Sequence, residues 1–505
     1  MKKTAKSKYG LHAIGEKIRN KIENVNLPAR SSVFFTLTNL LCKGAAFLFT
    51  PIFTRLLSPA DYGEYSLFST FLSLSAVVVT MEISGGIIMR LFQKEREHRF
   101  LSMLSAWLIS VVMAIPITVT LWLIHRISGF GMSFPAAYLF LFLALISISL
   151  INLYVSHCKF LYSWTTPFIT SIMQSVAAPI LSIALLKISY FSESNHVSLK
   201  IGAVTAVLLL TASVLLGVTL KNAHAESKTE HTGLSARRFI LSSARFLLKL
   251  ALPLLPYYLS IMVISQVDKL FISSLLGKSE LAKYSVAYSA GVALTAVTSG
   301  IMGALSPWIM RRTRAGEYDR VRETLDRIIS ASVPVIILFL CFAPEFFSFL
   351  APSEYQTALP VLFISAMIPI PLALAQCSSS IAIAKEKVGG VLFSGVFPAL
   401  LTVALDFLII RQAPLYSAAI ITASGFLLLA ALGIANVRKI TGNYTINVNK
   451  AFQNLIFLTI FSAAVYSFRS SLSARLIIAV TAFLSLIFSA KHIVSLLKEK
   501  ESCAG

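Results

Sequence analysis

The residue with the clearest chemical meaning in this sequence is a lysine inside an apolar segment. Lys43 lies within the apolar stretch 32–57, about 15 Å along the axis of a helix that would begin there, which is the middle of a bilayer. A charge at that depth costs about 2.5–3.5 kcal/mol on insertion scales, and a lysine stem does not easily reach either surface from it. Two partners would offset this cost: a negative group of a ligand, such as a phosphate, or a buried carboxylate of the chain.

Two acidic residues could supply that carboxylate or bind a coupling cation themselves. Glu82 lies in the inner half of the apolar stretch 64–88, and Asp268 lies near the expected outer end of 249–274. Two interpretations of Glu82 stay open. It faces a cavity, or it pairs with a cation on a neighbouring helix, which the glycines that follow it would allow to approach closely.

Further polar residues complete the candidate cavity set. Gln266 precedes Asp268 on the same segment, and Asn39 lies on the first segment, where it could instead only hydrogen-bond to a neighbouring helix. Asp406 lies five residues before Arg411, so we expect it at the outer membrane boundary.

Sequence patterns of catalytic and metal sites are missing. The chain has no P-loop, no G-x-S-x-G, no H-E-x-x-H and no D-x-D placed to bind a nucleotide sugar. Its five cysteines are scattered, without the C-x-x-C or Cys/His spacing of a metal site. We therefore predict no enzyme activity, no metal and no cofactor. Energy for any transport would come from a gradient of H⁺ or Na⁺, or from the metabolism of substrate and product.

These polar residues must be positioned by a chain that is mostly apolar. Of 505 residues, 56% are hydrophobic and only 13% are charged, with a mean hydropathy of +0.78, whereas soluble domains carry about 25% charged residues. This composition excludes a sizeable soluble domain and predicts an all-α polytopic membrane protein with about 14 transmembrane helices. The expected spans are 32–57, 64–88, 100–124, 136–156, 165–187, 199–220, 249–274, 284–309, 328–350, 357–383, 388–410, 414–435, 451–468 and 473–493.

The net charge of +22 is explained by topology. If Met1 is cytoplasmic, 33 of the 44 lysines and arginines lie on the cytoplasmic side, 10 lie on the other side and Lys43 lies between. Such a bias is the positive-inside signature, which places both termini in the cytoplasm. The basicity therefore gives no reason to expect a nucleic-acid partner.

Two short sequence repeats indicate a duplicated architecture. Residues 56–66 match residues 275–285 at a constant offset of 219, with Leu-Leu, an acidic residue and Tyr-Ser in common. Residues 88–90 recur as 309–311 at an offset of 221. Six helices separate the copies, so both halves run in the same direction through the bilayer and would be related by an axis along the membrane normal. The expected arrangement is two six-helix lobes plus two C-terminal helices.

This arrangement sets the expected boundaries. Pro253 and Pro256, near the start of the seventh helix, are the best candidates for a hinge, because a proline removes a backbone hydrogen bond. The parts are a basic cytoplasmic tail 1–30, an N-terminal lobe 31–220, a cytoplasmic linker 221–248, a C-terminal lobe 249–435, two further helices 451–493 and a cytoplasmic tail 494–505.

Three stretches resemble a known family. Residues 53–65 resemble the signature at the first outer loop of bacterial polysaccharide-unit flippases, the Wzx-type branch of the multidrug/oligosaccharidyl-lipid/polysaccharide exporter superfamily. Residues 266–270, continued to 285, are similar to that family's seventh-helix motif, and residues 82–90 are similar to the end of its second helix. Within the first stretch, the resemblance marks Arg55, Asp61, Tyr62 and Gly63 as signature residues.

The resemblance implies two lobes around a central cavity that opens alternately to each side. The implied cargo is an oligosaccharide on an undecaprenyl diphosphate carrier, moved from the inner to the outer leaflet for surface polysaccharides such as O-antigen or capsule. By position, Lys43 matches a first-helix cation of related flippases, which would suit the diphosphate. Few other cations lie at mid-depth in this sequence.

One alternative function stays open within the same superfamily. A multidrug or metabolite exporter could be coupled to Na⁺ or H⁺ through Asp268 or Glu82. A membrane-embedded sugar polymerase is disfavoured, because every predicted outer loop is short. The expected partners are the lipid-linked oligosaccharide, membrane lipids, and the polymerase and glycosyltransferases of the same pathway, with no nucleic acid. The expected location is the bacterial cytoplasmic membrane.

Overall fold

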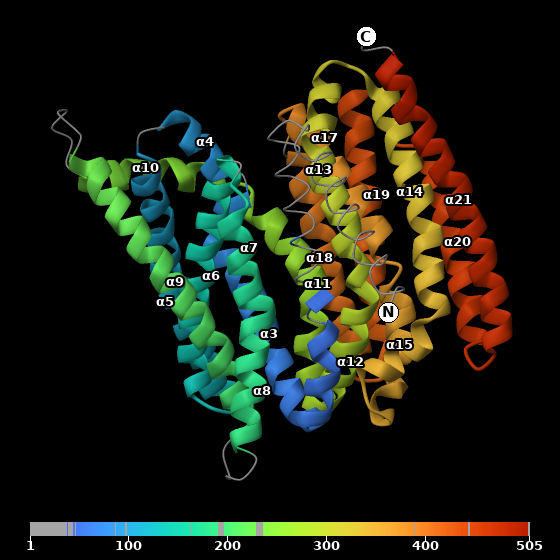
Figure 1. Ribbon diagram of the computed structural model, residues 1–505, viewed down its shortest axis with the longest axis horizontal. Helices are drawn as coiled ribbons and strands as arrows, with labels where there is room; N and C mark the ends of the chain where they lie inside the picture. Colours follow the sequence, from blue (N-terminus) through green and yellow to red (C-terminus); the bar gives the residue numbers. More distant parts are fainter. Residues whose placement is uncertain are drawn as a thin grey trace, which may run out of the picture.

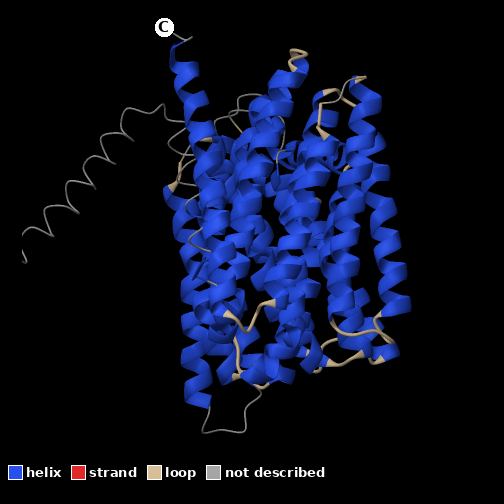
Figure 2. Cartoon of the chain, turned by 90° about the vertical axis from the view of Figure 1, so that its right-hand side faces the viewer, coloured by secondary structure: helices blue, strands red, loops and turns tan. Residues whose placement is uncertain are grey.

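The computed structural model describes residues 38, 44–45, 47–85, 87–95, 98–161, 163–189, 196–228, 236–387, 389–442 and 445–502. Throughout these ranges the chain forms helices and no strand, which confirms the all-α fold (Figure 2). Twelve of the described helices are long and apolar enough to cross a membrane, and two shorter apolar helices span Phe47–Leu56 and Leu472–Ile487. The count of fourteen spans stays a prediction. Lys43 and Asn39 lie outside the described residues.

The first group of helices forms the N-terminal lobe (Figure 1). After the helix Phe47–Leu56 it comprises α3 (Pro59–Thr80), the 3₁₀ turn η1 (Ile83–Gly85), α4 (Ile87–Lys94), α5 (Arg99–Ser128), α6 (Ala136–Phe160), α7 (Thr165–Ile172), the π-helical turn η2 (Met173–Ala177), α8 (Ala178–Ser189), α9 (His196–Lys228) and α10 (Ala236–Ala251).

The second group forms the C-terminal lobe and the last hairpin (Figure 1). It comprises α11 (Leu255–Leu275), α12 (Lys278–Gly291), η3 (Val292–Leu294), α13 (Thr295–Arg314), α14 (Tyr318–Cys341), α15 (Ala343–Leu350), η4 (Ser353–Ala358), α16 (Leu359–Ser365), α17 (Pro369–Ala384), α18 (Gly389–Ile409), α19 (Tyr416–Thr441), α20 (Val448–Ser467) and α21 (Leu472–Ser502).

The repeat found in the sequence is also visible in the helix boundaries. α12 begins at Lys278, which is 219 residues after Pro59, where α3 begins. The residues before them are Ser58, whose hydroxyl accepts the backbone N–H of Asp61 and so caps α3, and Gly277, whose φ of 93° favours glycine. Both copies therefore start a helix at the same register with different local chemistry.

Among the differences from the expected segments, two bear on the candidate site and on the junction of the lobes. The helix expected over 64–88 ends at Thr80, because Met81 and Glu82 adopt left-handed φ angles of 46° and 50°. Glu82 thus lies in a helix break rather than within a continuous helix. The stretch 221–248, expected as a linker, includes the end of α9 and most of α10.

The lobes meet mainly through α3 on one side and α11 and α12 on the other. We call the end of the molecule that carries Ser58 and Gly277 the contact end. The opposite end of the N-terminal lobe, which carries α4 and α10, is the linker end (Figure 1).

The last hairpin, α20 and α21, packs mainly on α14, with a smaller contact between α20 and α16. Arg475 of α21 is buried and donates to the carbonyl oxygen of Cys341 at 2.6 Å and to Oε2 of Glu345 at 2.7 Å. Near the other end of α20, the Asn454 amide donates to the Ser330 hydroxyl of α14 at 3.3 Å.

Candidate functional site

The C-terminal lobe buries a hydrogen-bonded carboxylate at Asp268, which is 0% exposed. Its Oδ2 accepts hydrogen bonds from the hydroxyls of Thr422, at 3.0 Å, and Tyr284, while Oδ1 accepts the backbone N–H of Lys269 at 2.8 Å. The donors come from α11, α12 and α19, so three helices converge on one carboxylate. The sequence predicted a functional acid here, and the structure shows what surrounds it.

A second carboxylate, Asp406 of α18, is also 0% exposed. Among the described residues neither of its oxygens has a hydrogen-bond partner, and its carboxyl interacts electrostatically with Asp268 and Tyr284. The sequence placed Asp406 at a span boundary because Arg411 follows it, and it does lie in the last turn of α18, but it is buried inside the protein.

Two buried carboxylates that interact electrostatically resist ionisation of both at once, and Lys269 beside Asp268 supplies only one compensating charge. Carboxylate and hydroxyl oxygens are donors that hard cations prefer. The arrangement can therefore hold a shared proton or a small monovalent cation. No cluster of three or more His, Cys, Asp or Glu side chains suited to a metal occurs in the described part of the chain.

Lys269 is the basic residue nearest in sequence to this pair, and its ammonium interacts electrostatically with the Asp268 carboxylate. Its Nζ donates to Oε1 of Gln266 at 2.7 Å and lies 4.6 Å from the ring centroid of Tyr288. Tyr288 stacks on Tyr284, with centroids 5.6 Å apart. Gln266, predicted as a cavity residue, therefore positions the neighbour of Asp268 rather than Asp268 itself.

The N-terminal lobe buries a cation instead, at Lys200 of α9, which is 2% exposed. Its Nζ lies 3.9, 4.7 and 3.6 Å from the ring centroids of Phe53, Tyr62 and Tyr65. Within the described ranges no carboxylate forms an ion pair with it. Sequence reasoning missed Lys200, because it lies at the start of an expected span where a lysine commonly reaches water. In the sequence, the only features related to this site were the aromatic residues Tyr62 and Tyr65, which lie on a distant segment.

The signature residues 55–63 lie at the contact end, against the other lobe. Nη1 of Arg55 donates to the carbonyl oxygens of Pro51, at 2.9 Å, and Phe349 of the C-terminal lobe, at 3.2 Å. A Cβ on Gly63 would lie 1.8 Å from the carbonyl oxygen of Lys278, so only glycine allows this approach. The carboxylate of Asp61 accepts the Ser58 hydroxyl at 2.7 Å and belongs to the helix cap.

An ion pair that sequence reasoning missed also joins the lobes at this end. Glu64, 4% exposed, pairs with Lys278 of α12 and accepts the backbone N–H of Ser133 at 2.5 Å. Beside it, the Thr54 hydroxyl donates to the carbonyl oxygen of Leu350 at 2.8 Å. The contact end is therefore held by specific polar contacts that would have to break for the lobes to part there.

The remaining predicted residues lie apart from the acidic pair. Glu82 is half-buried in the N-terminal lobe and interacts electrostatically with Tyr258 of α11. Pro253 lies in the turn between α10 and α11, and Pro256 lies in the first turn of α11. The predicted hinge thus coincides with an actual break in the helix, while its motion stays a prediction.

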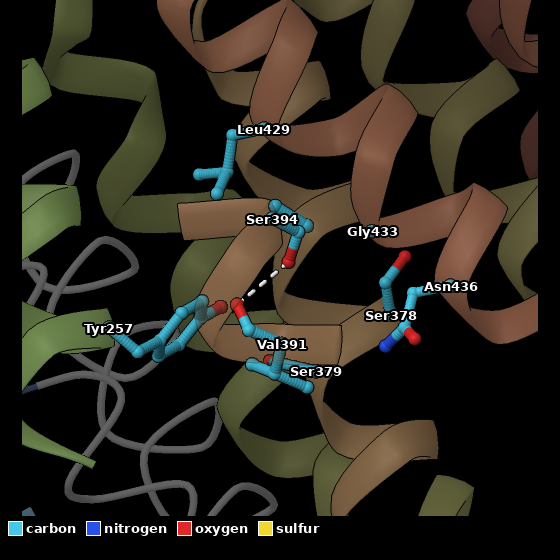
Figure 3. A pocket seen from close by; sticks show the side chains of 9 residues that line it. Tyr257, Ser378, Ser379, Val391, Ser394, Leu429, Gly433 and Asn436 are labelled. Atoms are coloured by element: carbon cyan, nitrogen blue, oxygen red, sulfur yellow. Dashed lines mark hydrogen bonds between the residues drawn. The ribbon is translucent and has the colours of Figure 1, made fainter. Parts of the chain in front are cut away.

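A small polar pocket lies directly after this break (Figure 3). Tyr257 of α11 faces hydroxyls of α17 and α18 and the Asn436 amide of α19, around a cavity of about 10 Å³. That is close to the space one water molecule needs. The pocket joins the ends of four helices and is too small for a sugar.

Comparison with known proteins adds independent information. A sequence profile described as polysaccharide biosynthesis protein matches residues 29–313, and one described as MatE matches residues 253–408. No curated protein matches the chain.

Several solved transporters are similar in fold. The lipid II flippase MurJ, in an inward closed conformation, gives a TM-score of 0.59 at 14% identity over 92% of this chain and 100% of that one. A multidrug resistance MATE family transporter in an inward-facing conformation gives 0.54 at 14% identity, over 81% and 98%. The Vibrio cholerae MATE transporter VcmN gives 0.52 at 15% identity, over 84% and 99%. The chain thus has the fold of multi-pass transporters and flippases of the MOP superfamily rather than that of an enzyme.

Proposed function

Because the chain belongs to the polysaccharide biosynthesis protein family, we propose that it is a flippase for oligosaccharides carried on undecaprenyl diphosphate. The match to that family over more than half of the chain is the observation that carries the proposal. Flipping would occur in the bacterial cytoplasmic membrane, with both termini inside, and would serve the polymerase and glycosyltransferases of the same pathway.

The proposed movement is alternating access between the two lobes. Three specific contacts between the lobes lie at the contact end: Gly63 against Lys278, the Glu64–Lys278 pair and the Thr54 hydrogen bond. The positive-inside distribution assigns this end to the outside. Delivery of cargo to the outer leaflet would then require these contacts to open, and resetting would require them to form again.

The acidic pair supplies the proposed coupling. A proton or Na⁺ bound at Asp268 and Asp406 would, together with the Lys269 ammonium, balance two negative charges on α11 and α18, and Asp268 also accepts hydrogen bonds from α12 and α19. Its release would leave like charges facing each other inside the lobe, which favours a different packing of these helices. This gives an ion gradient a way to bias the lobe arrangement.

The lipid tail of the cargo needs apolar surface as it passes. A groove of about 220 Å³ lies between α13, α14 and α21, and another of about 360 Å³ lies between α16, α19 and α20. Both are lined mostly by apolar side chains and could accommodate part of a prenyl chain. Lys43, outside the described residues, stays the proposed partner of the diphosphate.

The test is transport by the purified protein in vesicles without nucleotide. A fluorescent undecaprenyl-diphosphate oligosaccharide is added, and its exposure to an impermeant reagent is followed in time. We expect flipping above that of empty vesicles, because the chain has no nucleotide-binding loop. An absolute requirement for ATP, or no flipping at all, contradicts the proposal.

A disulfide lock provides the matched control. The double variant Glu64→Cys/Lys278→Cys should form a disulfide across the contact end and stop flipping. Reduction of the disulfide should restore flipping. The alternative function is a multidrug or metabolite exporter coupled to Na⁺ or H⁺, and it is supported by the MatE profile match and the similarity to a MATE family transporter. The same vesicles loaded with a cationic dye decide between them: dye export without lipid flipping would replace the flippase proposal.

A further inference from the structure

α10 is an amphipathic helix that lies across the linker end of the N-terminal lobe, at a large angle to the spans (Figure 1). One side of it is buried. Leu247 and Ala251 are 0% exposed and pack in a cluster with Phe92 of α4 and Met103 of α5. α10 is therefore attached to the lobe and is not a solvated linker.

The other side of α10 is basic and exposed. At 100° per residue, Arg238, Arg245 and Lys249 fall within about 40° of one another around the helix, and all three are exposed. The sequence has no acidic residue from 231 to 267. In the described ranges no carboxylate pairs with any of the three. Their charge is thus available to an anionic partner.

Apolar residues share this exposed side. Leu241 is 61% exposed and lies about 60° around the helix from Arg238, beside the basic residues, and Leu252, directly after the helix, is 56% exposed. Large apolar side chains beside cations suit the boundary between headgroups and acyl chains, and are unfavourable in open water. The neighbouring α4 adds the exposed residues Arg90 and Lys94, and the Lys94 ammonium lies 5.4 Å from the ring of Phe246.

We propose that the exposed side of α10 is a binding surface for anionic phospholipids of the adjoining leaflet. The guanidinium groups of Arg238 and Arg245 and the ammonium of Lys249 bind headgroup phosphates, while Leu241 and Leu252 enter the acyl region. A nucleic acid would not contact the leucines, and a water-filled cargo cavity would leave them exposed.

This surface has a direct mechanical connection to the acidic pair. A three-residue turn, Leu252–Leu254, joins α10 to α11, which carries Asp268. Lipid bound along α10 therefore fixes the start of α11 relative to the N-terminal lobe. The lipid composition of the leaflet would then shift the equilibrium between arrangements of the two lobes, although no lipid binds at Asp268 or Asp406.

Binding is tested at equilibrium on the full-length protein, with phosphatidylglycerol and phosphatidylcholine as the probes, by counting bound lipids in native mass spectrometry. We expect Arg238→Gln/Arg245→Gln/Lys249→Gln to weaken phosphatidylglycerol binding at least about tenfold, with phosphatidylcholine binding unchanged. The matched control is Arg314→Gln/Lys387→Gln/Lys439→Gln, which removes the same charge from exposed, unpaired positions near the ends of α13, α17 and α19. Equal weakening in both variants overturns the proposal.

Orientation is tested separately, with a fluorophore at Ser242→Cys on the exposed side of α10 and another at the exposed position Glu386→Cys. Headgroup-labelled quenching lipid in nanodiscs should quench the first more than the second, and the reverse order overturns the proposal.

Undecaprenyl diphosphate is the third probe. If it alone depends on the three α10 cations, the surface belongs to the cargo and the phospholipid proposal fails. None of these measurements involves transport, so they stand or fall independently of flipping.

Discussion

Tyr65 and Tyr284 occupy the same register of the repeat, 219 residues apart, and serve opposite charges. In the N-terminal lobe the face of the Tyr65 ring contacts the Lys200 ammonium at 3.6 Å. In the C-terminal lobe the hydroxyl of Tyr284 donates to the Asp268 carboxylate. A tyrosine ring face attracts cations and its hydroxyl satisfies anions. The same tyrosine of the repeat thus contacts a cation in one lobe and an anion in the other. The pattern of apolar residues in the helices does not reveal which charge each tyrosine contacts.

The largest expected effect comes from removing the acid that distinguishes the C-terminal lobe. Asp268→Asn should lower ion-coupled transport by about 5- to 150-fold, the usual range of coupling between two sites. Asp406→Asn should also lower transport but should not lower the melting temperature, because it removes a buried carboxylate without a hydrogen-bond partner. Transport and melting are measured on the same samples. A strong loss of stability in Asp406→Asn would show that this carboxylate has a structural partner.

A second experiment breaks the symmetry at the contact end. Gly63 corresponds in the repeat to Ala282, and the structure accommodates the Cβ of Ala282 in a fully buried position. A Cβ on Gly63 would instead clash with Lys278. Gly63→Ala should favour the conformation that is open at this end and cost about 1–3 kcal/mol of stability in the closed one. The control is Gly303→Ala, whose Cβ would meet nothing within 4 Å. Cross-linking of cysteines at 64 and 278 reports the closed population, which should fall only for Gly63→Ala.

The comparison of the two tyrosines is tested by removing the hydroxyl of each one in a separate variant. Tyr284→Phe leaves Asp268 with one donor fewer and should cost about 1–3 kcal/mol. Tyr65→Phe keeps the ring that faces Lys200 and removes only a hydroxyl that interacts with the Ser69 side chain, so it should cost less than Tyr284→Phe. Melting in detergent measures both. Similar losses in the two variants would mean that the hydroxyl of Tyr65 matters as much as its ring.

The smallest effect concerns an ion pair that is half-exposed, in contrast to the buried charges of both lobes. Hydrogen bonding from Arg475 lowers the pKa of Glu345 below its ordinary value of 4.5. Because the folded-state pKa is the lower one, this stabilisation is present above the ordinary pKa and is lost as the pH falls through the folded one. With Glu345 about half exposed, the loss should be under about 1 kcal/mol. Melting curves recorded at a series of pH values should show this loss of stability at low pH in the natural chain and not in Glu345→Gln.

The sequence predicted the fold better than the site. Apolar periodicity and the repeat at 219 residues located the helices and the parallel relation of the lobes, because burial in lipid dictates residue type over whole segments. Asp268 was found for the same reason, as an acid within such a segment, near its expected outer end. Asp406 was placed near the end of its span, where α18 has it, but Arg411 five residues later gave no sign that its carboxylate is fully buried.

Lys200 and the Glu64–Lys278 pair could not be found from local pattern. Each depends on helices that are distant in the chain: Lys200 on the rings of Phe53, Tyr62 and Tyr65, and Glu64 on the start of α12. A residue's position along a span says how deep it lies. It does not say which neighbour fills the space beside it.

The attachment of the last hairpin has an evolutionary consequence. α20 and α21 pack mainly on α14, and among the described residues none of the hydrogen bonds between the two lobes involves them. A chain could therefore gain or lose this hairpin in a single genetic event without repacking either lobe. New functions tied to the hairpin could then be selected while the inherited transport machinery continued to work.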